Sequence, residues 1–111
     1  MLFDELNTYQ RTIREGVDLA SMSFKPIKDY VGQVIYVDGF FFTDGKYGKQ
    51  VVVVGNGAKI NLPSRYVEKF EKIINNKAML DAVLDGKLVL KDIEESKTRN
   101  GTTVTFRFDV R

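Results

Sequence analysis

The chain contains no cysteine and no histidine. Without cysteine, a disulfide framework and a thiolate metal site are excluded, and a reducing compartment such as the cytoplasm is the expected location. The two absences together remove the commonest general base, the cysteine nucleophile and the usual zinc ligands. We therefore predict a protein that is not an enzyme and that uses no metal or cofactor.

A long apolar run is also missing, so we expect no membrane span and no membrane partner. The first twenty residues show no basic segment followed by an apolar stretch, and therefore do not resemble a secretory signal. Lysine and arginine number 17 against 15 acidic residues, a formal net charge of +2. This excess is too small to identify a nucleic-acid binder, so the positions of the charges carry the information.

The composition, with 111 residues of which 43% are hydrophobic and 29% charged, is that of one globular domain. We assign this domain to residues 25–111, and residues 1–24 to an N-terminal arm or short helix that ends at Gly16. The helix is predicted from an amphipathic spacing of apolar residues, with a surface that docks a second subunit as the alternative. These apolar residues are Leu2, Leu6, Tyr9, Ile13 and Val17.

Residues 33–42 are rich in β-branched and aromatic side chains and predict a first strand, with a bulge or bend at Gly39. A polar, glycine-punctuated loop over 43–49 leads to a second strand at 50–54. The pair Asn56-Gly57 predicts a tight hairpin to a third strand at 58–62.

Apolar residues at helical spacing over 66–74 predict an amphipathic helix with Ser64 as its N-cap. Further helical turns over 79–84 end at Gly86. Two strands, 87–95 and 102–110, flank a loop over 96–101. The order of three strands, a helical segment and two strands predicts an all-β fold, a five-stranded OB-fold barrel with a helical insertion.

An OB-fold presents its sheet face and two of its loops to oligonucleotides or oligosaccharides. Here both loops lean basic, and strand alternation places further polar and aromatic side chains on the outer face. Single-strand binding needs cations for phosphates and aromatic rings on which unpaired bases stack. The predicted nucleic-acid-binding residues are Tyr36, Phe40, Lys46, Tyr47, Lys49, Lys59, Asn61, Lys97, Arg99 and Arg107.

Each of these residues has an alternative role that involves no ligand. The Phe40–Phe42 triplet is typical of a strand that fills the core, and Tyr47 has the alternative of lying across its own hairpin. The loop cations have the alternative of simple solvation. The acids Asp92, Glu94 and Glu95 are interpreted as a solvated strand edge, not as a carboxylate cluster.

The segment from about Lys25 onward resembles the small OB-type single-stranded DNA-binding proteins of phages and integrative mobile elements of Gram-positive bacteria. The resemblance rests on Tyr30-Val31-Gly32, Gly39-Phe40-Phe41-Phe42, Gly45-Lys46-Tyr47-Gly48-Lys49 and Ile60-Asn61-Leu62-Pro63. It implies coating of single strands in DNA replication or recombination, often as a homodimer or higher homo-oligomer. Many cellular single-strand binders recruit partners through an acidic tail, which we do not expect here.

Two other functions are compatible with the same fold. A protein-interaction module, acting as an accessory subunit through the barrel face or residues 1–24, is favoured by the near-zero net charge. An oligosaccharide binder is the third candidate. For the first hypothesis, RNA is an alternative to DNA.

Overall fold

In the computed structural model, which describes residues 12–14, 16–45, 48–99 and 101–111, six strands form one curled sheet. The strand order is β1-β4-β3-β2-β5-β6. The strands are β1 (Phe24–Pro26), β2 (Ile35–Gly45), β3 (Gly48–Gly55), β4 (Ala58–Asn61), β5 (Leu88–Thr98) and β6 (Gly101–Val110). The all-β prediction is confirmed, with six strands in the described residues instead of five.

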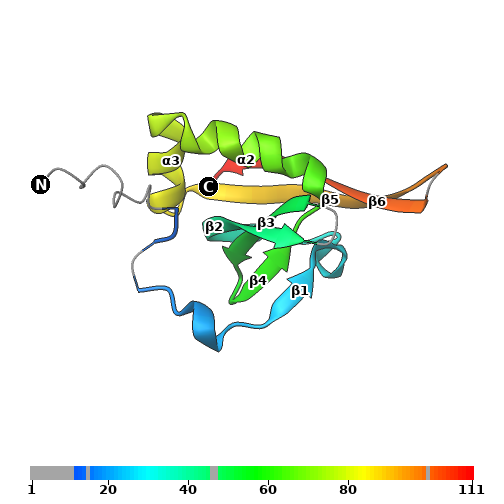
Figure 1. The fold of residues 1–111 in the computed structure, drawn as a ribbon, viewed down its shortest axis with the longest axis horizontal. Helices are drawn as coiled ribbons and strands as arrows, with labels where there is room; N and C mark the ends of the chain where they lie inside the picture. The colour runs from blue at the N-terminus through cyan, green and yellow to red at the C-terminus, as the bar shows by residue number, and fades with distance from the viewer. Residues whose placement is uncertain (1–11, 15, 46–47, 100) are drawn as a thin grey trace, which may run out of the picture.

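In the described part of the chain, two short α-helices and three 3-10 turns complete the fold. Helices α2 (Val67–Ile74) and α3 (Lys77–Leu84) connect β4 to β5, and the turns are η1 (Leu19–Ser21), η2 (Ile27–Tyr30) and η3 (Ser64–Tyr66). The helices lie along one side of the sheet, while η1 and β1 run along the opposite side (Figure 1). The long β5–β6 hairpin projects beyond the body of the domain (Figure 1).

The strand that the sequence did not predict is β1, which pairs parallel to β4 with Phe24 opposite Lys59. The main-chain N–H of Lys59 also donates to the carbonyl of Ser23 (3.0 Å). A three-residue strand that ends in Pro26 has too short a pattern to recognise, and proline is tolerated there because β1 is at the edge of the sheet.

The predicted bend at Gly39 is confirmed. Pairing between β2 and β3 shifts register between Val37 and Gly39. Before the bend, Ile35 and Tyr36 pair with β5, so one strand serves both halves of the sheet.

Beyond that point, a segment near the N-terminus pairs with β2. Phe40 donates its N–H to the carbonyl of Thr12 (3.0 Å), and Arg14 donates to the carbonyl of Asp38 (2.8 Å). A Cβ on Gly39 would lie 2.5 Å from the Cα of Ile13, so only glycine permits this approach. The helix predicted within 1–24 falls largely outside the described residues.

Both predicted hairpin loops are shorter than expected. The ladder of β2 and β3 continues to the pair Gly45 and Gly48, and that of β5 and β6 to Thr98 and Gly101. Residues assigned to loops, including Lys49 and Lys97, are therefore strand residues. The Asn56-Gly57 turn is confirmed, because both residues have positive φ (51° and 75°).

The helical segment covers an aromatic core. Phe70 of α2 makes an edge contact with Phe40 (centroids 4.9 Å apart), and Tyr66 stacks on Phe106 (4.2 Å). Ser64 begins η3 and does not cap α2, which corrects the predicted N-cap. Gly86 follows α3 with φ of 73°, as predicted for the helix stop.

Arg65 ties η3 to the outermost strand of the sheet. Its guanidinium donates to the hydroxyl of Thr103 and to the main-chain carbonyl of Val104, both on β6. The contact fixes the start of the helical segment against the edge of the β5–β6 hairpin.

Candidate nucleic-acid interface

The prediction that Phe40 stacks on a base is wrong. Its side chain is fully buried, in contact with Phe42 and Phe70. The bulge at Gly39 determines which side chains of β2 point into the core. Burial of the phenyl ring there is favourable because it removes apolar surface from water. Tyr30, in the segment that carries the resemblance, is also buried; burial, with the charge of Asp29, raises the pKa of its hydroxyl.

Of the predicted residues in the first hairpin, Lys46 and Tyr47 lie outside the described residues. Lys49, at the start of β3, is exposed but already partnered. Its Nζ lies 2.8 Å from a carboxylate oxygen of Glu71 and 4.4 Å from the centre of the Phe42 ring. A phosphate would have to compete with both groups for this cation.

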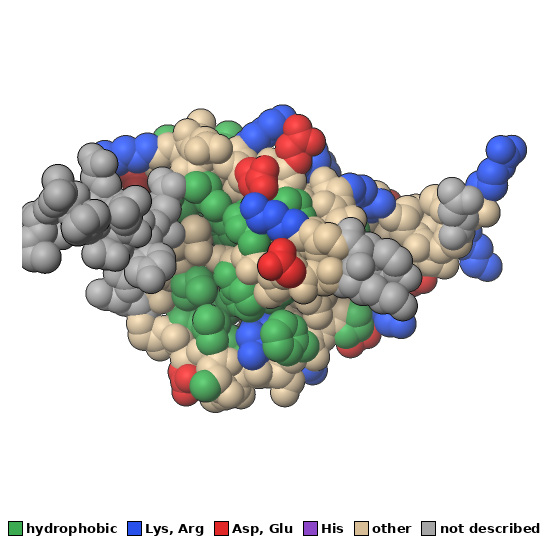
Figure 2. All heavy atoms as spheres, in the orientation of Figure 1, with side chains coloured by type: hydrophobic (Ala, Val, Ile, Leu, Met, Phe, Trp, Pro, Cys, Tyr) green, Lys and Arg blue, Asp and Glu red, His purple; other side chains and the backbone are tan. Residues whose placement is uncertain are grey.

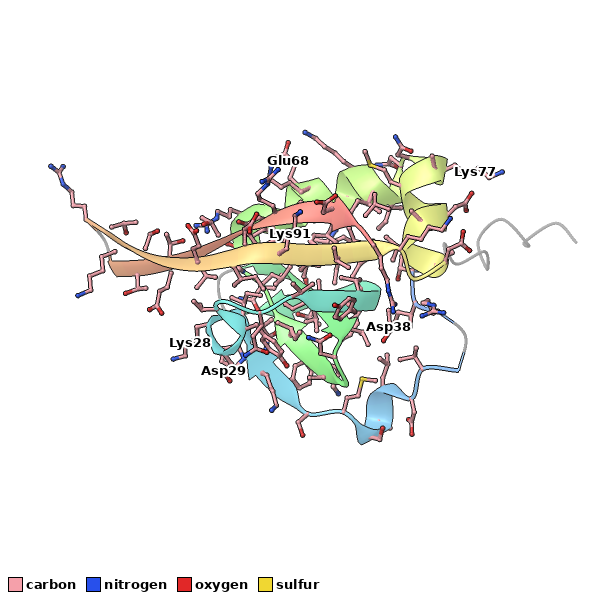
Figure 3. All side chains as sticks on the ribbon, turned by 180° about the vertical axis from the view of Figure 1, so that it is seen from behind. Lys28, Asp29, Asp38, Glu68, Lys77 and Lys91 are labelled. Atoms are coloured by element: carbon pink, nitrogen blue, oxygen red, sulfur yellow. The ribbon has the colours of Figure 1, made fainter. Side chains whose placement is uncertain are left out.

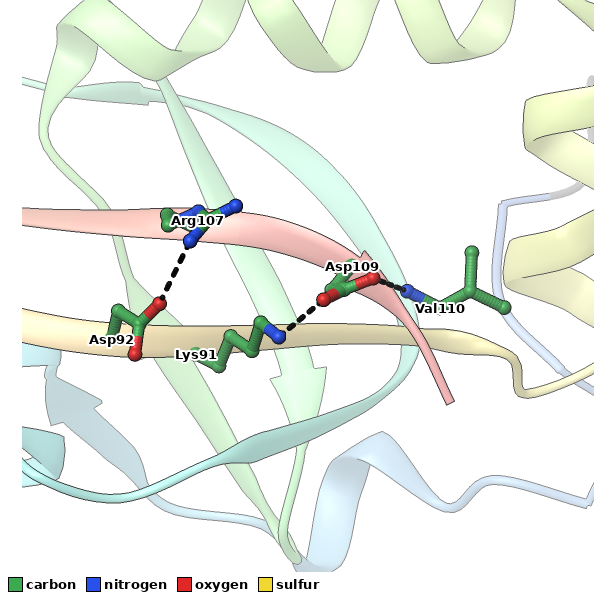
Figure 4. Close-up of polar contacts among 5 residues, drawn as sticks. All are labelled: Lys91, Asp92, Arg107, Asp109 and Val110. Carbon is green, nitrogen blue, oxygen red and sulfur yellow. Dashed lines mark hydrogen bonds and ion pairs between the residues drawn. The ribbon is translucent and has the colours of Figure 1, made fainter.

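Arg107 is likewise paired. Its guanidinium lies 3.4 Å from a carboxylate oxygen of Asp92, and Lys91 forms an ion pair with Asp109 alongside it (Figure 4). The pairing of Arg107 opposite Lys91, together with the register shift that follows Lys91 in β5, brings the four groups together. The two cations and two anions of this group cancel in formal charge.

The ion pair with Lys91 alters the titration of Asp109. The side-chain hydrogen bond from Lys91, helped by the main-chain N–H of Val110 (2.7 Å), lowers the pKa of Asp109 below the ordinary value. Hydrogen bonds to a carboxylate favour its ionised form, so the ion pair persists into mildly acidic solution.

At the far end of the hairpin, Lys97 and Arg99 are exposed, and neither makes an ion pair with another described residue. Arg99 follows the last paired residue, Thr98, so it stands at the tip. These two cations are free to meet phosphates.

Tyr36, on β2, lies beside the opposite end of the β5–β6 hairpin, where it pairs with β5. Its ring is about half exposed and lies 5.0 Å from the guanidinium carbon of Arg111. Tyr36 pairs with Val89, and strand geometry puts Lys97 roughly 26 Å further along β5. The structure therefore does not bring Tyr36 and the tip cations into one compact site.

A third group lies on the outer face at β4 and β1. Lys59 and Asn61 are half-buried on this face, as alternation with the buried Ala58 and Ile60 predicted. The Lys59 ammonium lies 4.3 Å from the ring centre of Phe24, whose side chain is 55% exposed. Sequence reasoning missed Phe24; the signal that was available is an aromatic residue directly before a lysine.

The middle of the same face is apolar and covered. Val52 and Val54 point away from the core-facing Val51 and Val53 of β3, yet all four side chains have no exposed area. Figure 2 shows hydrophobic side chains gathered in the middle of this face. The Lys59–Phe24 pair therefore lies beside buried apolar side chains of β3, since Lys59 pairs with Val54.

Comparison of the chain with protein-family models, with curated proteins and with solved structures found no match. Among the described residues, no group of three or more acidic side chains is arranged to hold a metal ion. In the described part of the chain, no helix has both the length and the apolar character needed to cross a membrane.

Proposed function

We propose that this chain is a non-enzymatic single-stranded DNA-binding protein built on an OB-fold and acting in the cytoplasm in DNA replication or recombination. The succession β4-β3-β2-β5-β6, with α2 and α3 inserted between β4 and β5, supports the OB assignment. In this proposal β1 is an addition to the five strands of that fold.

The observation that carries the proposal is the exposed Phe24 ring with the ammonium group of Lys59 against it. Lys25, the next residue along β1, is also exposed, but strand alternation points its side chain to the opposite face. An aromatic face next to an ammonium group matches an unpaired base and its phosphate. We propose that this group binds the strand and that Lys97 and Arg99 give a second phosphate contact.

Fluorescence anisotropy of a labelled oligo-dT tests the proposal. We expect tight binding that weakens with salt, by about 0.7 in the log–log slope for each phosphate contact, and much weaker binding to a duplex of equal length. Oligo-U measured in parallel tests RNA as the alternative ligand. Absence of binding to oligo-dT at low salt would contradict the proposal.

A protein-interaction module is the second candidate, and one observation favours it. Lys49 and Arg107 are neutralised by acidic neighbours within the chain, which reduces the surface available to phosphates. Binding of a protein partner that is insensitive to salt, together with no binding of oligo-dT, would favour this function.

We further propose that the DNA-binding form is a homodimer. Sedimentation velocity at several protein concentrations, with and without oligo-dT, measures its mass. A monomer in both conditions would contradict the proposed homodimer. The DNA-binding proposal would then be judged by the anisotropy measurement alone.

A further inference from the structure

A concave site lies between the helices and the base of the β5–β6 hairpin, with a volume of about 400 Å³. Its apolar lining includes Ile73, Met79, Val83, Leu88, Phe108 and Val110. The side chains of Met79 and Val110 are 51% and 69% exposed, so apolar surface is open to solvent. A site of this size and lining is typical of small-molecule binding.

Three ammonium groups border the same groove. Lys69 and Lys72 come from α2 and Lys87 precedes β5; all three are exposed, and none forms an ion pair with another described residue. The acidic residue of the lining, Asp109, is paired with Lys91. The groove therefore combines an apolar floor with an unbalanced positive edge.

We propose that this groove binds a small amphipathic carboxylate, whose apolar chain lies on Ile73 and Phe108 while its anionic group meets the lysines. Apolar burial supplies the attraction, and the ammonium groups select an anion over a neutral molecule of the same shape. The groove is at the opposite end of β5 from Lys97 and Arg99, so the proposal does not depend on DNA binding.

Methyl NMR of protein labelled at methionine tests the proposal with octanoate as the probe. Met79 lines the groove, whereas Met22 precedes β1 and is an internal control. We expect octanoate to shift the Met79 methyl signal saturably and to leave Met22 unchanged. No shift of Met79 at millimolar octanoate would overturn the proposal.

Charge-reversed variants distinguish the contribution of the carboxylate group to binding from that of the apolar chain. The double variant Lys72→Glu, Lys87→Glu should weaken octanoate about tenfold and leave octan-1-ol unchanged. The matched control Lys28→Glu, Lys77→Glu reverses two exposed lysines that do not line the groove and should bind octanoate as the wild type does (Figure 3). Equal octanoate affinity in both double variants would contradict the proposal that the lysines of the groove select an anionic ligand.

Ala82→Trp tests the location independently, because Ala82 lines the groove and a tryptophan there would fill it. We expect this variant to lose binding of both octanoate and octan-1-ol, with an unchanged backbone spectrum away from α3. Undiminished octanoate binding in a folded Ala82→Trp protein would place the ligand elsewhere and overturn the proposal.

Discussion

The ammonium group of Lys59 lies 4.3 Å from the centre of the Phe24 ring. The parallel pairing of β1 with β4 puts these two residues opposite each other. The pair depends on an edge strand of three residues. The surface that best matches a base and a phosphate therefore depends on β1, the strand that the sequence did not predict.

Phe24→Ala should weaken oligo-dT binding by about 1–3 kcal/mol, the value of one stacked base. The melting temperature should change little, because more than half of the ring is exposed. Anisotropy and thermal unfolding measure the two effects. Val31→Ala, which truncates an exposed apolar residue outside the proposed site, is the control; equal affinities of the two variants would remove Phe24 from the site.

Reversal of the tip charges, Lys97→Glu with Arg99→Glu, should lower the salt dependence of oligo-dT binding. Each lost phosphate contact reduces the slope of log affinity against log salt by about 0.7. Lys77→Glu with Lys28→Glu changes the net charge equally at sites away from the tip and should keep the wild-type slope. An unaltered slope in the tip variant would show that the hairpin does not contact the strand.

Phe40→Ala should destabilise the fold by about 3–5 kcal/mol, because the ring is fully buried against Phe42 and Phe70. Urea unfolding followed by circular dichroism measures the loss. Tyr36→Ala, on the exposed side of the same strand, should cost much less. A Phe40→Ala protein as stable as the wild type would contradict the assignment of this residue to the core.

Asp109→Asn should lower the melting temperature at neutral pH but not in strong acid. The lowered pKa of Asp109 means that its contribution to stability is full above about pH 4, the ordinary range of aspartate, and is lost as the pH falls through the folded value. The gap between wild type and variant should therefore close on acidification. Asp81→Asn, on α3, is the control, and a gap independent of pH would contradict the role of the Lys91 ion pair.

Gly39→Ala should detach residues 12–14 from β2, because a Cβ there would overlap the main chain of Thr12 and Ile13. We expect faster hydrogen exchange at the amides of Arg14 and Phe40, which donate across this contact. The amide of Lys59, bonded to Ser23, should be unaffected and is the internal control. Unchanged exchange at Arg14 would mean that the segment adapts to the extra methyl group.

Much of the fold was predictable because its signals are local. The bend at Gly39, the Asn56-Gly57 turn and the stop at Gly86 follow from backbone freedom at single residues. The alternation that buries Val104 and Phe106 follows from the period of a strand. The added strand β1 was not predictable, because its only support is a partner distant in the sequence.

The site was harder to predict than the fold. The exposure of Lys97, Arg99 and Tyr36 was predictable from composition and strand alternation. The ion pairs were not predictable, because their partners are far apart in the sequence and meet only in the folded protein. These pairs are Lys49 with Glu71 and Arg107 with Asp92. Phe40 was misplaced because a bulge decides which face its side chain takes.

The contact between Arg65 and the carbonyl of Val104 has a consequence for self-association. β6 is the last strand of the sheet, ten residues long, and such an edge invites another chain to add as a further strand. Because the guanidinium already occupies one acceptor of that edge, an incoming strand meets a charged side chain instead of a free carbonyl. At this one position of β6, Arg65 therefore disfavours the addition of a further strand.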